Sequence, residues 1–215
     1  NDAVKEALEA AKLQAGLGMA TDTGVLQAQS DLLSSQSQLD NLRNLSNNLR
    51  SQLCLLTGWK VDATPEIGTV PAADPSKIDN IDLAADILKA IGNNQTLISQ
   101  RHASSTKSTA AIDNRLKNID VSEQQLTVEM QRLYSVMQQK KVLYDAANTA
   151  YQKALLAKGA AERQYDLKML SRLQYLGAEA QFYQAEGARK SADTALLQAM
   201  LDYDWAVQGY VSIPQ

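Results

Sequence analysis

The sequence contains few of the residues on which strand-rich folds depend. Its 215 residues include 10 glycines and 4 prolines, and aromatic side chains make up only 5% of the chain. Strand-rich folds need many turns, for which glycine and proline are the usual residues, and they pack aromatic and β-branched side chains. The sequence therefore argues against an all-β fold and against an α/β enzyme.

Groups that perform chemistry are also scarce. The chain has one cysteine, Cys54, and one histidine, His102, which excludes an internal disulfide and a Cys- or His-based zinc site. The sequence contains no phosphate loop, no dinucleotide-binding glycine motif and no His-Glu-x-x-His motif. Asp202 and Asp204 point about 200° apart on a helix, so they do not form an acid–base pair. We therefore expect a protein that is not an enzyme and that holds no cofactor or metal.

Charge and hydropathy exclude two further classes. The formal net charge is −3, and no local stripe of Lys and Arg offers the phosphate contacts that nucleic-acid binding requires. No stretch approaches the ~18 consecutive apolar residues of a membrane-spanning helix. The first residues read directly as helix, without a signal-like basic and apolar segment, so we expect either a cytosolic protein or a trimmed fragment.

Alanine, leucine and glutamine dominate what is present. The counts are Ala 31, Leu 29 and Gln 21, and these residues are strong helix formers that commonly fill coiled coils. No glycine or proline occurs between Gln95 and Lys158. A helix from about 105 to 165 would be roughly 90 Å long, which no ordinary globular domain holds. The composition therefore predicts an all-α, elongated protein.

Three stretches alternate spacings of three and four between residues that are mostly apolar or small, with Glu123, Lys140 and Arg189 as charged exceptions. This is the heptad pattern of a coiled coil. The stretches span residues 25–56, 112–154 and 175–206. Each position of the third stretch lies 150 residues after its counterpart in the first. A repeat of helix, tight turn and heptad helix predicts two antiparallel coiled-coil helical hairpins.

Prolines mark one irregular segment. Three of the four lie between Pro65 and Pro75, and the fourth is the penultimate residue. A short amphipathic helix follows the connector, from about Ile81 to Ala103. We predict a first, partial hairpin over 1–57 with its tip near 16–23, a connector and short helix over 58–103, and a second, long hairpin over 104–210 with its tip near 165–171.

The hairpin tips and the heptad stretches, here called seams, contain a recognisable set of residues. The first copy has Leu17-Gly18-Met19-Ala20-Thr21, Val25-Leu26-Gln27-Ala28-Gln29 and Leu55-Leu56-Thr57-Gly58. The second copy has the stretch from Tyr165 to Leu173, then Ala178-Glu179 and Ala206-Val207-Gln208-Gly209. Together these residues resemble the TolC-like outer membrane efflux protein family over nearly the whole chain. The stretch from Asn93 to Leu97 looks like the equatorial segment of that family.

This resemblance implies a non-catalytic envelope protein. It implies the periplasmic helical duct of an outer-membrane efflux or export component, built from three chains whose hairpins pack side by side. A long helix with more than one apolar seam independently favours a homo-oligomer, because one partner helix does not cover both seams. The resemblance further implies that the hairpin tips dock a periplasmic adaptor of a tripartite exporter. By position, the docking residues are Gly18, Met19 and Thr21 in the first tip and Lys168, Met169 and Ser171 in the second.

The resemblance also implies a gate at the tips. Its candidates here are Tyr165, which matches the family's gate tyrosine, and Asp22 and Arg172, each two residues from a charged position of the family. A simpler interpretation treats Asp22 and Arg172 as solvated surface charges. In the same interpretation the tip glycines only permit the turn, and Thr21 and Ser171 only cap helices.

The resemblance places the protein in the cell envelope, on the periplasmic side. Residues 103–120 lack the alternation that membrane β-strands require, so we expect no barrel strands from this chain. Membrane contact would then come only from parts outside this sequence, and an outer-membrane association would need a barrel elsewhere. The alternative function is a structural coiled-coil spacer or interaction protein without a conduit.

Overall fold

The structure of the chain is a computed structural model, and it describes residues 2–17, 22–60, 63–102 and 109–211. These residues form helices joined by turns and a connector, with no strand among them. The prediction of an all-α fold is therefore confirmed. The helices in chain order are α1 (Asp2–Gly16), α2 (Asp22–Leu56), the 3₁₀ helix η1 (Pro75–Asn80), α3 (Leu83–Asn93), α4 (Gln95–His102), α5 (Thr109–Asp166) and α6 (Arg172–Val207).

Two compact units divide the chain. The first comprises Asn1–Thr69 and Gln152–Gln184, and the second comprises Val70–Tyr151 and Ala185–Gln215. The helices α5 and α6 contribute to both units, because the boundaries between the units fall inside these two helices. The longer of them, α5, has 58 residues. A straight α-helix of that length measures about 87 Å.

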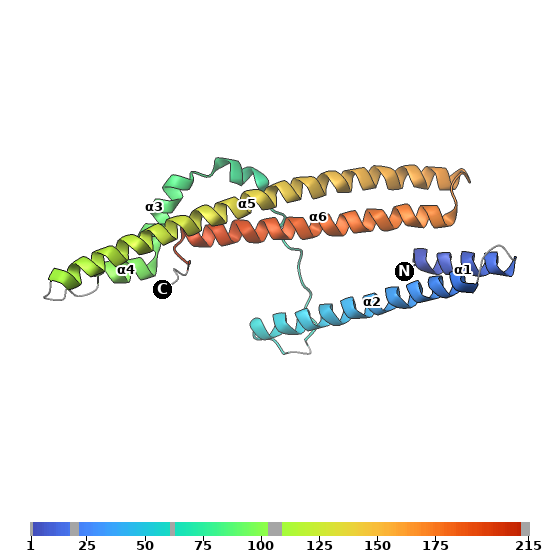
Figure 1. Cartoon of the computed structure of the whole chain (residues 1–215), viewed down its shortest axis with the longest axis horizontal. Coiled ribbons are helices and arrows are strands. Elements are labelled where there is room, and N and C mark those ends of the chain that lie inside the picture. Colours follow the sequence, from blue (N-terminus) through green and yellow to red (C-terminus); the bar gives the residue numbers. More distant parts are fainter. Residues whose placement is uncertain (1, 18–21, 61–62, 103–108, 212–215) are drawn as a thin grey trace. The chain divides into compact units, whose positions relative to one another are not determined.

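In the first unit, α1 lies against the first part of α2 (Figure 1). Leu8 of α1 is buried, and the α2 side chains Leu32 and Leu39 are partly covered. Farther along α2 the leucines are exposed, beginning with Leu42 at 61%. Near the end of the helix, Cys54 is buried and its Sγ donates a hydrogen bond to the carbonyl oxygen of Ala63 at 3.6 Å. The thiol therefore packs under the connector.

The main apolar core lies in the second unit. Figure 1 shows α6 running alongside α5, with α3 and α4 beside the first half of α5. Burying one large apolar side chain contributes roughly 1.5–3 kcal/mol to the free energy of unfolding. The core consists of Ala73, Ile78, Ala90, Leu97, Leu126, Met130, Leu133, Met137, Leu196, Ala199, Tyr203 and Ala206.

Contacts between side chains show that α5 and α6 run antiparallel in the second unit. The rings of Tyr134 and Tyr203 lie 6.1 Å apart, and the guanidinium of Arg189 lies 4.6 Å from the ring centre of Tyr151. Along the contact, residue numbers therefore increase in α5 while they decrease in α6. Tyr203 also donates a hydrogen bond from its hydroxyl to Asp86 of α3 at 3.1 Å, and burial raises the pKa of this phenol.

Aspartates start the short helices of the connector. Asp74 precedes Pro75, and its carboxylate accepts from the backbone N–H and the hydroxyl of Ser76, which lowers the pKa of Asp74. Asp82 caps α3 by accepting from the N–H groups of Ala84 and Ala85, each at 3.1 Å. These caps follow from sequence, since Asp is a preferred N-cap residue and Pro is preferred at the first helical position.

The sequence predicts one helix from about Ile81 to Ala103, whereas the structure has two, with a break at Asn94. Asn94 is 1% exposed and has an extended backbone, with ψ of 116°. Its amide nitrogen donates to the carbonyl oxygens of Gly209 and Val211 at 3.2 and 3.1 Å, and its amide oxygen accepts from the N–H of Leu97 at 3.1 Å. The break therefore lets the Asn94 side chain bond to the chain beyond α6 in the protein interior. Local helix propensity does not reveal this contact.

Three helices end with the same backbone turn. After α2, the N–H of Trp59 donates to the carbonyl of Cys54, and after α6, Tyr210 donates to Trp205 in the same way. Glycine occupies the left-handed position of both turns, with φ of +75° at Gly58 and +89° at Gly209. This is the Schellman arrangement, in which glycine is the usual residue because it has no Cβ.

Candidate functional site

The third such turn joins α5 to α6, and its left-handed residue is a lysine. Lys168 has a φ of +61°, and it is the non-glycine residue with a positive φ in the described part of the chain. Its N–H donates to the carbonyl of Tyr165, and the N–H of Met169 donates to the carbonyl of Gln164, both at 2.9 Å. A left-handed backbone costs an L-residue roughly 1–2 kcal/mol, so a side chain stands here where glycine would be more stable.

Ser171 begins α6 with a reciprocal cap. Its hydroxyl oxygen accepts from the N–H of Gln174 at 3.3 Å, and the Gln174 amide oxygen accepts from the N–H of Ser171 at 3.0 Å. This is the capping box that Ser-x-x-Gln predicts. The capping role expected for Ser171 in the simpler interpretation is therefore observed.

Apolar side chains are exposed on the same turn. Leu167 is 70% exposed and Met169 is 74% exposed, while Leu173 in the first turn of α6 is 41% exposed. Lys168 lies between the first two in the sequence. We use the name "second tip" for Leu167, Lys168 and Met169. It is a small apolar surface with one positive charge.

Aromatic rings form the layer beneath the second tip. The rings of Tyr165 and Tyr175 stack with centres 5.1 Å apart, and the Lys168 ammonium lies 5.7 Å from the Tyr165 ring centre. Burial and the charge of Glu179 raise the pKa of the Tyr175 phenol. One layer farther on, the Lys158 ammonium lies 4.7 Å from the ring of Phe182. These contacts brace the two helices where the chain reverses.

The first tip is only partly described. Gly18, Met19 and Thr21 lie outside the described residues. On either side, Leu17 is 66% exposed after α1, and Asp22 is exposed as the first residue of α2.

The structure gives side-chain contacts for two of the three gate candidates, and the third, Asp22, is exposed at the start of α2. Tyr165 stacks on Tyr175. The ion pair of Arg172 is with Glu6 of α1, with 3.5 Å between Nε and a carboxylate oxygen. This pair is largely exposed, so it contributes little to stability.

Removing the left-handed strain at the second tip gives a direct test of its geometry. We expect Lys168→Gly to raise the free energy of unfolding by about 1 kcal/mol, because glycine adopts this φ without strain. Urea unfolding followed by far-UV circular dichroism measures the change. Lys153→Gly is the matched control, since Lys153 is an exposed lysine inside α5. It should lose about 1 kcal/mol. A loss of stability in Lys168→Gly would show that the lysine's ring contact outweighs the strain.

Metal-ligating clusters and membrane-spanning helices are absent from the part of the chain that the structure describes. Across the described residues, no group of three or more His, Cys, Asp or Glu side chains is arranged to hold a metal ion. None of the helices, as far as they are described, is both long and apolar enough to cross a membrane.

No known family model matches the chain, and no curated protein matches its sequence. The resemblance to the TolC-like family therefore stays a prediction from the sequence.

Proposed function

We propose that this chain is a non-catalytic wall segment of an export duct in the cell envelope, of the TolC-like kind. Its two repeats form coiled-coil helical hairpins, and several copies, three by resemblance, pack side by side around the conduit. The hairpin tips dock a periplasmic adaptor protein. In this proposal the membrane is reached through parts outside this sequence.

The observation that carries the proposal is Lys168 at the second tip. The turns after α2 and α6 have the same hydrogen-bonding pattern, and both use glycine at the left-handed position. Backbone strain is kept in proteins mainly where a side chain has a function. Here the strained lysine sits between Leu167 and Met169, which expose 70% and 74% of their surface. A small apolar patch with one cation suits the end of a partner's helices, which offers apolar side chains and unpaired backbone carbonyls.

The proposal assigns different tasks to the tip and to the helix pair behind it. Contacts such as Lys158 with Glu179 at 3.6 Å and Tyr165 with Tyr175 hold α5 and α6 together near the turn. The tip side chains make few such contacts and are exposed. Changing them should alter docking and leave the fold intact.

The test is export by cells that contain the full-length protein. We expect Leu167→Asp combined with Met169→Asp to raise accumulation of a fluorescent efflux dye to the level of cells lacking the gene, because the apolar tip no longer seats on the adaptor. Leu201→Asp is the matched control, since Leu201 is an exposed leucine of α6, at 47%, far from the tip in sequence. It should leave accumulation at the wild-type level.

Dye accumulation that is unchanged even when the gene is deleted would reject an export role and favour the spacer function. Accumulation that rises on deletion and stays normal in the tip variant would keep the duct and reject docking through the second tip. Equal amounts of protein in the wild-type, tip-variant and control strains, checked by immunoblot, and equal helix content of the purified proteins, checked by circular dichroism, exclude a folding defect as the cause.

A further inference from the structure

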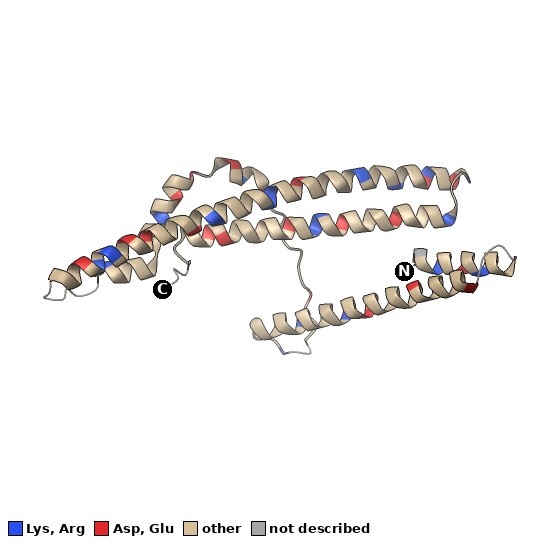
Figure 2. Cartoon of the chain, in the orientation of Figure 1, with Lys and Arg blue, Asp and Glu red and all other residues tan. Residues whose placement is uncertain are grey.

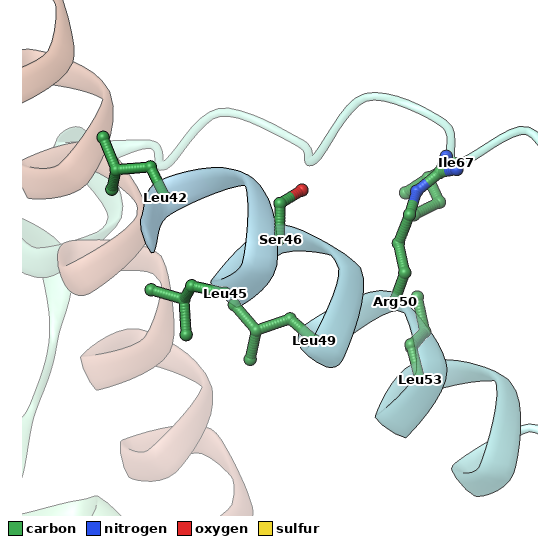
Figure 3. Close-up of a pocket in the computed structure, with 7 residues that line it drawn as sticks. All are labelled: Leu42, Leu45, Ser46, Leu49, Arg50, Leu53 and Ile67. Atoms are coloured by element: carbon green, nitrogen blue, oxygen red, sulfur yellow. The ribbon is translucent and has the colours of Figure 1, made fainter. Parts of the chain in front are cut away.

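The second half of α2 has an apolar face that nothing in its unit covers. Leu42, Leu45, Leu49 and Leu53, here called the α2 leucine face, are 61, 53, 55 and 41% exposed. They line a groove of about 370 Å³ together with Ser46, Arg50 and Ile67 of the connector (Figure 3). Their spacing of three and four residues makes one continuous stripe.

A helix is the natural cover for such a stripe. In α6, the positions 150 residues after Leu49 and Leu53 are Ala199 and Tyr203, which are 7% and 2% exposed. Tyr203 packs on Tyr134 of α5. The same spacing of residues is thus buried by a helix in the second unit and exposed in the first.

The long helix α5 also has a line of exposed apolar side chains, separate from the side that faces the core. Val121, Val128 and Val142, here called the α5 valine face, are 51, 64 and 67% exposed and share one heptad position. The first two line a groove of about 410 Å³ with Gln124, Gln125 and Glu129. Leu126, Met130 and Leu133, which point to the core, lie on another side of the helix. The valine face is therefore a separate surface for a second helix.

The charges around Val121 and Val128 are opposite to those around the α2 leucine face, whereas Lys140 and Lys141 precede Val142. Between Asn41 and Lys60 the sequence has Arg43, Arg50 and Lys60 and no acidic residue, and in Figure 2 the end of α2 beyond Asp40 carries only its two arginines. Asp40 lies just before this stretch and pairs with Arg43 at 3.5 Å. Between Asn118 and Gln131 it has Asp120, Glu123 and Glu129 and no basic residue. Opposite charges steer two surfaces together, whereas like charges placed opposite one another are repulsive.

Some of these charges have charged partners within the chain and some do not. Glu123 pairs with Arg101, and Glu129 pairs with Arg132. By contrast, Arg50 donates to the backbone carbonyl of Pro65 at 3.4 Å, and Asp120 accepts from the side-chain amide of Gln124 at 3.1 Å. Both of these partners are neutral. Arg50 and Asp120 therefore keep charge that an opposite face can complement.

We infer that the α2 leucine face of one copy packs on the α5 valine face of a second copy. Packing α2 on α2 would place arginines together, and packing α5 on α5 would place carboxylates together, so the charges favour the mixed contact. The contact joins two different surfaces. Made head to tail from copy to copy, it is heterologous and produces a closed ring or an open filament. This inference deepens the proposed duct, and it rests on the self-association proposed there.

A complementation experiment tests the inference. One variant carries Leu45→Glu and Leu49→Glu, and the other carries Val121→Glu and Val128→Glu. Each variant loses one of the two faces and keeps the other. We expect each variant alone to be a monomer of 23.4 kDa by light scattering after size-exclusion chromatography. We expect an equal mixture to form a species of twice that mass that does not grow further, because one intact face remains on each chain.

Leu88→Glu is the matched control, because Leu88 of α3 is 71% exposed and lies outside both faces. It should keep the wild-type mass. Raising the salt concentration should shift the wild type toward the monomer, since exposed charges are then screened. The changed residues are exposed, so far-UV circular dichroism should be unaltered. If a Glu variant loses helix, Leu45→Gln with Leu49→Gln repeats the test without new charge.

Other outcomes overturn the inference. A variant that stays oligomeric alone would show a contact between identical faces, and a mixture that stays monomeric would show that the two faces do not meet. A wild-type monomer at every concentration would remove both this contact and the proposed duct. If the wild type is oligomeric but the mixture of the two variants stays monomeric, only this contact is rejected. If the mixture forms the dimer but the tip variant of the export test still exports the dye, only docking of the adaptor is rejected.

Discussion

Replacing Gly209 with alanine should destabilise the second unit more than most single substitutions. Gly209 follows α6 with a φ of +89°, so any L-residue is strained there. A Cβ at this position would also lie 2.5 Å from the carbonyl carbon and oxygen of Asn93 and 2.8 Å from the nitrogen of Asn94. Those neighbours are backbone atoms, which do not move aside as a flexible side chain does. We therefore expect a steric and a conformational cost together.

The expected loss is about 4 kcal/mol in the free energy of unfolding, of which the left-handed backbone contributes roughly 1–2 kcal/mol. The remainder comes from moving Asn93 and Asn94. Asn93 donates from its amide to the carbonyl of Val207 at 3.2 Å, and Asn94 donates to Gly209 itself. Thermal unfolding followed by circular dichroism should show a midpoint lower by about 10 °C for a chain of this size.

Gly187→Ala is the matched control. Gly187 lies inside α6, and a Cβ there meets nothing within 4 Å. Alanine should therefore raise the free energy of unfolding by about 0.5–1 kcal/mol, opposite in sign to the change at Gly209. Equal effects at the two glycines would mean that the close approach of Asn93 carries no energetic weight.

The helix ends show what sequence reasoning can and cannot find. Gly58 and Gly209 each follow a heptad run, and a glycine after an apolar helix is a well-understood stop signal. Lys168 ends α5 with the same backbone turn, yet lysine is a good helix former and gives no such signal. The sequence places a tip near 165–171, whereas the identity of the strained residue becomes visible only from its φ.

The break at Asn94 was hidden for a different reason. The residues on both sides favour helix, and the prediction of one helix over about 81–103 follows from them. The competing interactions come from Gly209 and Val211, more than 100 positions later in the sequence. A local pattern does not contain that information, although the side-by-side asparagines Asn93 and Asn94 do stand out in the apolar run.

Burial along the seams could be predicted only in part. The heptad pattern treats every seam position alike, but Leu32 and Leu39 are half-buried while Leu49 and Leu53 are exposed on the same helix. The difference depends on how far α1 extends along α2, which is a property of the neighbour. Patterning thus identifies the apolar face, and only the packed partner decides which part of it is covered.

The buried amide of Asn94 leads to a prediction that depends on pH. The amide nitrogen gives its two hydrogens to carbonyl oxygens, while the amide oxygen accepts from Leu97. Asn94→Asp replaces that nitrogen with an oxygen, which then faces the carbonyls of Gly209 and Val211 without a hydrogen between them. A buried carboxylate in that position is repelled by both carbonyls and has lost its hydration. At pH 7 we expect a loss of about 4 kcal/mol in the free energy of unfolding.

Acid should return part of that stability, because a protonated carboxyl can donate one hydrogen bond where the amide donated two. The surroundings disfavour the charged form, so the pKa of the new carboxyl is higher in the folded than in the unfolded chain. The folded state then binds more protons, and the free energy of unfolding rises as pH falls through the folded pKa. The measurement is urea unfolding of wild type and variant at a series of pH values. Asn118→Asp, an exposed change on α5, should give no such gain. A deficit at Asn94 that stays constant with pH would show that the new carboxylate reaches solvent in the folded chain, and the expected rise of its pKa would then be wrong.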